Sequence, residues 1–162
     1  MSLVPQENAI IDALDPMARK VFRRFVAWCE DLLEGTRYRI SLESFTKPWI
    51  AGRRTVEQQQ ALYEIGRTKP GQKVTNCDGR KKKSNHQSGM ALHLGMRWRR
   101  SGGESGGAET GAGKFIRHQT KGESSEANQL FQLIVAEAER RRILWGGRWK
   151  GLLDYHHFEI EE

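Results

Sequence analysis

The chain has 162 residues, of which 37% are hydrophobic, and a formal net charge of +7. This length and composition predict a single globular domain, residues 1–162, that is large enough to bury a core. No apolar run approaches the roughly 20 residues of a membrane span. Residues 1–7 lack a basic region followed by an apolar run, so we expect no signal peptide and accumulation in the cytoplasm.

The positive charge implies an anionic partner, and nucleic acid, acidic lipid headgroups and the bacterial envelope would all fit. The basic run at residues 80–83 has no interleaved aromatic residues and belongs to no recognised nucleic-acid motif, so nucleic acid ranks last. Two cysteines, Cys29 and Cys77, do not make a disulfide framework. We expect both to be thiols.

Asp15 and Pro16 give an N-cap and a first helical residue, and Gly35 gives a stop, which together predict a helix. Its apolar residues recur at helical spacing and should face the core: Phe22, Phe25, Val26, Cys29, Leu32 and Leu33. Alternation over residues 38–42 then predicts a half-buried strand. A capping box at residues 55–58 opens a second helix, which we expect to run to Gly66.

Further along, a short strand is predicted at residues 74–77, a polar loop at 78–84 and another strand at 91–96. Six of the thirteen residues from 101 to 113 are glycine, so we expect a flexible loop at about 101–114. A third helix is predicted over about 125–142, then a turn at 145–149 and a final strand at 155–160. Because helices and strands do not alternate regularly, the order favours an α+β fold.

Four of the five histidines lie in two short segments, residues 84–93 and 154–159. We expect His86 in a loop, His93 on the strand that follows it, and His157 on the last strand. On that last strand, alternation places His157 and Glu159 on one face and Phe158 on the other. Imidazole nitrogens are standard zinc ligands, and a catalytic zinc needs three protein ligands and an open position. Asp154 precedes His157 by three residues, a suitable place for a general base. Spacing alone is a weak signal for such a site.

The two histidine segments also carry family motifs. The pattern S-x-H-x-x-G-x-A-x-D is matched at residues 84–91, with His93 in the last position, and D-x-x-H-F-E is matched at residues 154–159. From Gly52 onward the sequence resembles the zinc D-alanyl-D-alanine carboxypeptidase and L-alanyl-D-glutamate peptidase family, which includes VanY-like enzymes and phage endolysins. Matches at residues 52–55, 57–58, 62–68 and 145–149 extend the resemblance over about two thirds of the chain.

This resemblance implies a Hedgehog/DD-peptidase fold, with helices packed on a small antiparallel sheet that carries the zinc site. It also implies His86 and His157 as ligands of Zn2+ and Asp154 as the catalytic base. Arg54 resembles the arginine that steadies the scissile carbonyl or a substrate carboxylate, and Ser84 a residue that contacts substrate.

At His93 the chain departs from the family, which has an aspartate ligand at this position. Three histidines and water also form a known catalytic zinc set, and Nδ1 of histidine is as many bonds from Cα as an aspartate oxygen. We therefore predict His93 as the third ligand. Loss of the carboxylate should acidify the zinc water and weaken the hold on the metal. A second departure is Arg53, which replaces a tyrosine of the family.

The sequence is thus interpreted as a monomeric zinc-dependent peptidase that cleaves stem peptides of bacterial peptidoglycan. A phage or prophage endolysin, released to the host cell wall, fits this interpretation. Both L-alanyl-D-glutamate endopeptidase and D-Ala-D-Ala carboxypeptidase activity stay open. One alternative is a catalytically disabled relative that binds peptidoglycan, because His93 replaces the usual ligand. The other alternative is a basic nucleic-acid-binding protein.

Overall fold

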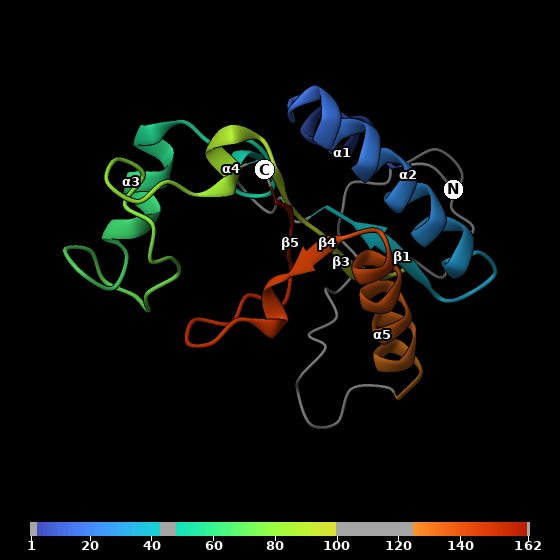
Figure 1. Ribbon diagram of the computed structural model, residues 1–162. Coiled ribbons are helices and arrows are strands. Elements are labelled where there is room, and N and C mark those ends of the chain that lie inside the picture. The colour runs from blue at the N-terminus through green and yellow to red at the C-terminus, as the bar shows by residue number, and fades with distance from the viewer. Residues whose placement is uncertain (1–2, 43–47, 100–124, 162) are drawn as a thin grey trace.

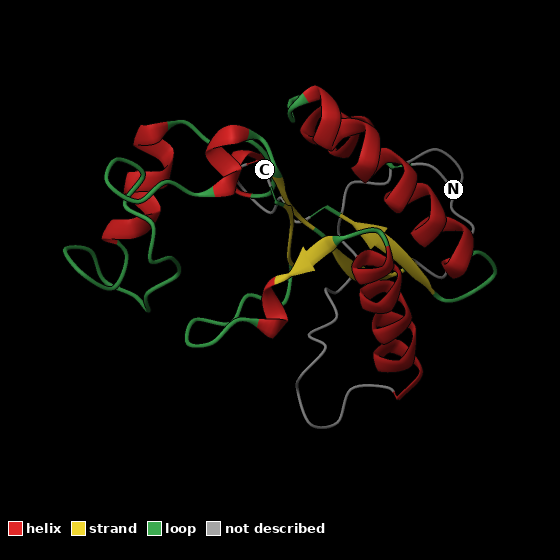
Figure 2. Ribbon diagram, viewed as in Figure 1, coloured by secondary structure: helices red, strands yellow, loops and turns green. Residues whose placement is uncertain are grey.

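The computed structural model describes residues 3–42, 48–99 and 125–161 (Figure 1). The glycine-rich loop expected at about 101–114 lies outside these residues. Within them, helices pack beside two small antiparallel sheets, which confirms the predicted α+β class (Figure 2). No helix in this part of the chain is both long and apolar enough to cross a membrane.

The two sheets share no strand. One pairs β1 with β3, and the other has the order β2-β5-β4. The strands are β1 (Tyr38–Ser41), β2 (Ala91–His93), β3 (Gly95–Trp98), β4 (Ile143–Trp145) and β5 (His157–Ile160). The helices are α1 (Pro5–Asp12), α2 (Pro16–Leu33), α3 (Val56–Glu64), α4 (Asn85–Ser88) and α5 (Ser125–Arg140), with 3-10 turns at Pro48–Ile50 and Gly146–Arg148.

The helix starts follow the capping chemistry of the sequence. Asp15 Oδ1 accepts a hydrogen bond from Met17 N at 2.8 Å, and Pro16 occupies the first helical position of α2. At α3, Gln58 N donates to Thr55 Oγ1 and Thr55 N donates to Gln58 Oε1, which is the predicted capping box. Both predicted helix starts are confirmed.

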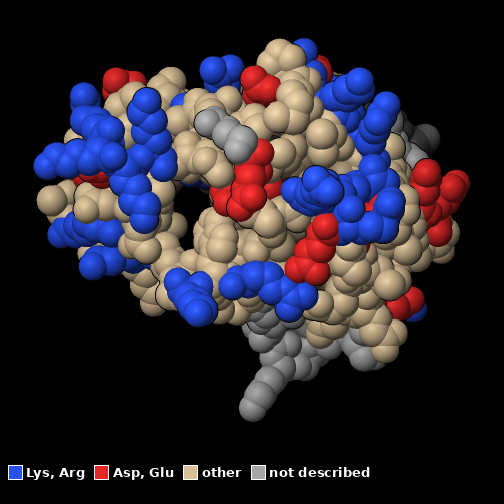
Figure 3. Space-filling view, in the orientation of Figure 1, with Lys and Arg blue, Asp and Glu red and all other residues tan. Residues whose placement is uncertain are grey.

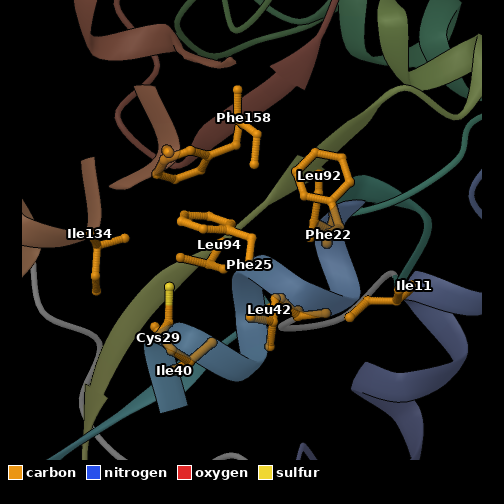
Figure 4. Close-up of a cluster of buried hydrophobic side chains, with 14 of the residues drawn as sticks. Ile11, Phe22, Phe25, Cys29, Ile40, Leu42, Leu92, Leu94, Ile134 and Phe158 are labelled. Carbon is orange, nitrogen blue, oxygen red and sulfur yellow. The ribbon is translucent and has the colours of Figure 1, made fainter. Parts of the chain in front are cut away.

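The core joins α1, α2 and α5 to the β1–β3 sheet and to one face of the β2-β5-β4 sheet (Figure 4). Phe158 of β5 is fully buried, and its ring centroid lies 5.7 Å from that of Phe25 on α2 and 6.4 Å from that of Phe131 on α5. Burying a side chain of this size contributes roughly 1.5–3 kcal/mol. The core side of the sheet is thus fixed by large apolar side chains of two helices.

Side-chain alternation sends the neighbouring residues to the opposite face of the same sheet. In the β2–β5 register, Leu92 pairs with Phe158 and His93 pairs with His157. Since successive side chains of a strand point to opposite faces, the buried Leu92–Phe158 pair turns both histidines away from the core. The face of the sheet behind the core is therefore where the candidate site forms.

Several predicted elements were wrong. Residues 74–77 form no strand, because side chains bind their backbone groups instead: Cys77 N donates to Thr75 Oγ1, and Gln59 Nε2 donates to the Cys77 carbonyl. The single strand expected at 91–96 is divided at Leu94 into β2 and β3, which join different sheets. Both faces of this stretch are buried, so its pattern gave no sign of the break. Helix α1 and strand β4 were not predicted.

The unpredicted α1 is tied to the first sheet through the buried carboxylate of Glu7, which is 5% exposed. This carboxylate accepts hydrogen bonds from Val4 N, Ser41 Oγ and Leu42 N, each at 3.1 Å. It also pairs with Arg39 Nη1 at 3.4 Å, and the Arg39 side chain is itself only 14% exposed. The hydrogen bonds and the ion pair of this buried carboxylate hold α1 against β1.

Replacing Glu7 with alanine should lower the free energy of unfolding by about 3 kcal/mol, because Arg39 and three other donors lose this acceptor. Urea unfolding followed by circular dichroism measures this change. Asp12→Ala is the matched control, because its ion pair with Arg23 is exposed and should cost less than about 1 kcal/mol. Equal effects of the two substitutions would contradict the assigned role of Glu7.

Candidate metal centre and its cavity

His86 lies on the short helix α4 rather than in the expected loop. Ser84 caps this helix: its Oγ accepts from His86 N at 3.3 Å, and Ser84 N donates to Gln87 Oε1 at 2.9 Å. Gly89 ends the helix with a φ of +79°, and a Cβ at this position would lie 2.6 Å from Asp15 N. Glycine is therefore required where α4 meets the start of α2.

His93 and His157 face each other across β2 and β5. Neither residue uses its amide to bond the other strand: His93 N donates to the Ala51 carbonyl at 2.8 Å, and His157 N donates to the Asp154 carbonyl. The two residues thus form a non-hydrogen-bonded pair, the arrangement in which facing side chains come closest. Their ring centroids are 5.5 Å apart, and that of His86 lies 4.8 and 5.0 Å from those of His93 and His157.

Hydrogen bonds at the far side of two rings fix which nitrogens face inward. His86 Nδ1 donates to the Gly52 carbonyl at 2.7 Å, and His157 Nε2 donates to Glu159 Oε2 at 2.7 Å. Because those oxygens accept, the remaining nitrogen of each neutral ring carries a lone pair. These two nitrogens, His86 Nε2 and His157 Nδ1, approach to 3.3 Å. Two converging lone pairs repel unless a cation lies between them.

This arrangement fits a zinc ion. Nitrogens that share a tetrahedral zinc at about 2.0–2.1 Å lie about 3.3–3.4 Å apart, which matches the His86–His157 separation. One ligand atom from each of His86, His93 and His157 falls within 4.8 Å of the others, and all three residues are buried. Burial, together with nearby Arg54, holds the pKa of His86 well below its ordinary value, and burial also lowers the pKa of His93. Neutral imidazole is the form that binds a metal.

Asp154 lies at the edge of this cluster, with Oδ2 at 3.3 Å from His93 Nε2. Burial opposes the charge of its carboxylate, but the neighbouring histidines, His93 foremost, together hold the pKa of Asp154 well below its ordinary range. Gly146 fixes the backbone, because its carbonyl accepts from Asp154 N, and a Cβ on Gly146 would collide with the Asp154 carbonyl. The carboxylate is therefore ionised and held in position.

Arg54 enters the site from the start of α3 and is 7% exposed. Its backbone N donates to the His86 carbonyl at 3.0 Å, and its guanidinium donates to Gln59 Oε1 and the Ile50 carbonyl. Burial lowers the pKa of Arg54 to about 10, while Asp154 opposes this shift, so the side chain is charged at neutral pH. Its buried Nε has no hydrogen-bond partner among the described residues. One buried donor of this fixed cation is thus unsatisfied within the described residues.

Sequence reasoning missed two residues of this site. Gln59 is fully buried and joins Arg54 to the 75–77 segment, since its Nε2 donates to Thr75 Oγ1 at 3.2 Å and to the Cys77 carbonyl at 3.0 Å. It stands in a run of three glutamines, and nothing in that run marks the middle one as buried. Glu159 was placed on the His157 face of the last strand, but the hydrogen bond between them was not foreseen.

The histidines open into a cavity of about 690 Å³ between the sheet and the α3 side of the molecule. All the predicted site residues line it: Arg54, Ser84, His86, His93, Asp154 and His157. The Oγ of Ser84 accepts the hydrogen bond that caps α4, so the contact that the structure shows for this side chain is structural. Trp149 covers one side, with its ring 4.6 Å from that of His157.

Two comparisons with known proteins agree with this geometry. A family model for D-alanyl-D-alanine carboxypeptidase matches residues 78–160, a span that includes all three histidines and Asp154. Among solved structures, the chain is similar to the Serratia marcescens L-Ala D-Glu endopeptidase ChiX, with a TM-score of 0.56 and 16% sequence identity. That match covers 99% of this chain and 90% of the other chain, and at this identity it supports the fold.

The Glu159–His157 contact predicts a graded effect on zinc affinity. Glu159→Ala should weaken zinc binding by about 10- to 100-fold, because the ring of His157 loses the acceptor that fixes its tautomer and orientation. Glu159→Gln keeps an acceptor and should lose less. Competition with a chromogenic chelator measures the affinity. Glu161→Ala, an exposed change just after β5, is the control, and equal affinities for all the variants would exclude this role.

Proposed function

Because the chain belongs to the D-alanyl-D-alanine carboxypeptidase family, we propose that it is a zinc-dependent peptidase acting on the stem peptides of bacterial peptidoglycan. The observation that carries the proposal is the convergence of three buried imidazoles in one cavity with an ionised carboxylate and a fixed arginine. Its resemblance to phage endolysins supports a wall-degrading role of that kind, carried out by a single domain.

The three histidines, Asp154 and Arg54 each have a role in this proposal. Zinc bound by His86, His93 and His157 would polarise the scissile carbonyl and activate the attacking water. Asp154, which is ionised and lies beside the histidine cluster, accepts the proton of that water. Arg54 donates to the carbonyl oxygen, on which negative charge develops, or to a substrate carboxylate. Gln59 holds the guanidinium in place for this contact.

The wall of the cavity suits a peptide that carries a carboxylate. Lys82, Lys83 and Lys150 contribute basic groups, while Ile65 and Leu152 contribute apolar surface. Both peptide bonds that the family resemblance suggests have a carboxylate close by. A D-alanyl-D-alanine terminus ends in a free carboxylate, and an L-alanyl-D-glutamate bond carries one beside it. The products of digestion will identify the bond.

The test combines metal analysis with digestion. After zinc loading and desalting, the protein should hold close to one zinc per chain and release fragments from soluble muropeptides, as measured by mass spectrometry. Asp154→Asn should lower turnover by about 100- to 10,000-fold, because the general base is lost, while zinc content stays the same. Asp12→Asn, at a residue that does not line the cavity, is the control. Absence of zinc, or of cleavage by the zinc-loaded protein, would overturn the proposal.

The disabled relative is the competing interpretation, and it depends on His93. The contact between Asp154 and His93 supports a working site, because it keeps the base beside the ligand cluster. We therefore expect the unmodified protein to be active, and His93→Asp to tighten zinc binding because a carboxylate adds negative charge. Its effect on the pH profile should exceed its effect on the rate. An inert natural protein beside an active His93→Asp variant would establish the disabled relative instead.

A further inference from the structure

The positive charge of the chain is concentrated in one segment. Nine of the 27 basic residues, but only three of the 20 acidic residues, lie between residues 53 and 83. This segment alone carries a net charge of +6, against +7 for the whole chain. It contains α3 and the loops on either side, and in Figure 1 it lies to one side of both sheets. We call residues 53–83 the basic lobe.

The space-filling view shows the same separation. In Figure 3, Lys and Arg side chains cover the lobe at the left, beside a hollow in the surface. Over the rest of this face, basic groups lie among acidic ones. Lys82 and Lys83 belong to the lobe and also line the cavity that holds the histidines. The basic surface is thus continuous with the candidate active site.

Ion pairing also differs between the lobe and the rest of the molecule. Outside the lobe, several arginines are paired with carboxylates, among them Arg23 with Asp12, Arg39 with Glu7 and Arg148 with Glu139. Within the lobe, all of which the structure describes, Lys69 with Glu64 is the one such pair between side chains. Most of the lobe's exposed cations therefore form no ion pair with a carboxylate.

The loop that carries the basic run has a defined conformation. Asp78 Oδ1 accepts from Arg80 N and Lys82 N, each at 2.9 Å, and Gly79 N donates to the Lys82 carbonyl at 3.0 Å. Gly79, at a φ of +86°, packs against Gln59, and its carbonyl accepts from Gln87 Nε2 at 2.8 Å. The one acidic side chain of the loop is thus used by backbone amides. The adjacent like charges are left exposed, although they repel one another.

We propose that the basic lobe is a docking surface for the carboxylate-bearing stem peptides of peptidoglycan that surround the stem held in the cavity. This inference rests on the proposed function, which supplies the polymer. Peptidoglycan repeats its carboxylates along the strand, so several neighbouring stems reach a surface continuous with the cavity. The basic run lacks the interleaved aromatic side chains on which nucleic-acid bases stack, which disfavours nucleic acid as the occupant.

The experiment compares two variants of equal net charge. K73Q/R80Q/K81Q removes three cations from the lobe, none of which lines the cavity. K20Q/R24Q/R142Q removes three exposed cations elsewhere. Both are made with Asp154→Asn, so that binding is measured without digestion. The probe is purified peptidoglycan stripped of phosphate polymers, and bound protein is sedimented between about 0.05 and 0.5 M salt.

The lobe variant should lose about tenfold or more in affinity at low salt and depend less on salt, while the control variant stays within about twofold of its parent. Equal loss in both variants would show that only net charge matters, and no loss in either would exclude the lobe. If the parent binds only walls that retain phosphate polymers, or prefers duplex DNA, the assigned occupant is wrong. Should the lobe triple variant unfold at a lower Tm, K73Q/K81Q keeps the Arg80–Gln60 contact and repeats the test.

The docking surface and the proposed function fail in different ways. Zinc-dependent cleavage by the unmodified protein tests the function and does not depend on these variants. A lobe variant that binds peptidoglycan as well as its parent overturns the docking surface, even where the unmodified protein is an active peptidase.

Discussion

The register of β2 against β5 is the constraint on which the rest of the site depends. It places Phe158 in the core and His157 in the cavity, although the two residues are neighbours in sequence. A slip of one residue would exchange them, because it turns each side chain of a strand to the other face. The aromatic packing of Phe158 against Phe25 and Phe131 opposes that slip. The hydrophobic core thus determines where the imidazoles converge.

Hydrogen bonds to backbone and carboxylate groups then refine the positions that the sheet provides. The Gly52 carbonyl orients His86, Glu159 orients His157, and Asp154 lies against His93. Each ring therefore has an oxygen partner as well as its place in the cluster. Buried polar groups are stabilising only when such partners are present, which explains why three histidines can remain buried side by side.

Much of this arrangement could be predicted from sequence, where the signal was local. Asp15 and Thr55 marked the starts of two helices, and alternation in the last strand placed His157 on the face opposite Phe158. Family motifs supplied Asp154 and Arg54. Features formed by contacts between distant segments were missed. Gln59 gains its role only when the 75–77 segment folds over it, and the same contacts remove the strand expected there.

His86 also links the two ends of the basic lobe. The chain enters the lobe past Gly52 and Arg54 and leaves it through α4, and His86 bonds to both entering residues: its ring to the Gly52 carbonyl and its own carbonyl to Arg54 N. The two ends of the 31-residue basic lobe are thus held together by the side chain and the backbone of His86. Closing a loop of this length has an entropic cost, which the contacts of His86 help to offset. The orientation of the lobe relative to the sheet is therefore set at the candidate metal ligand itself.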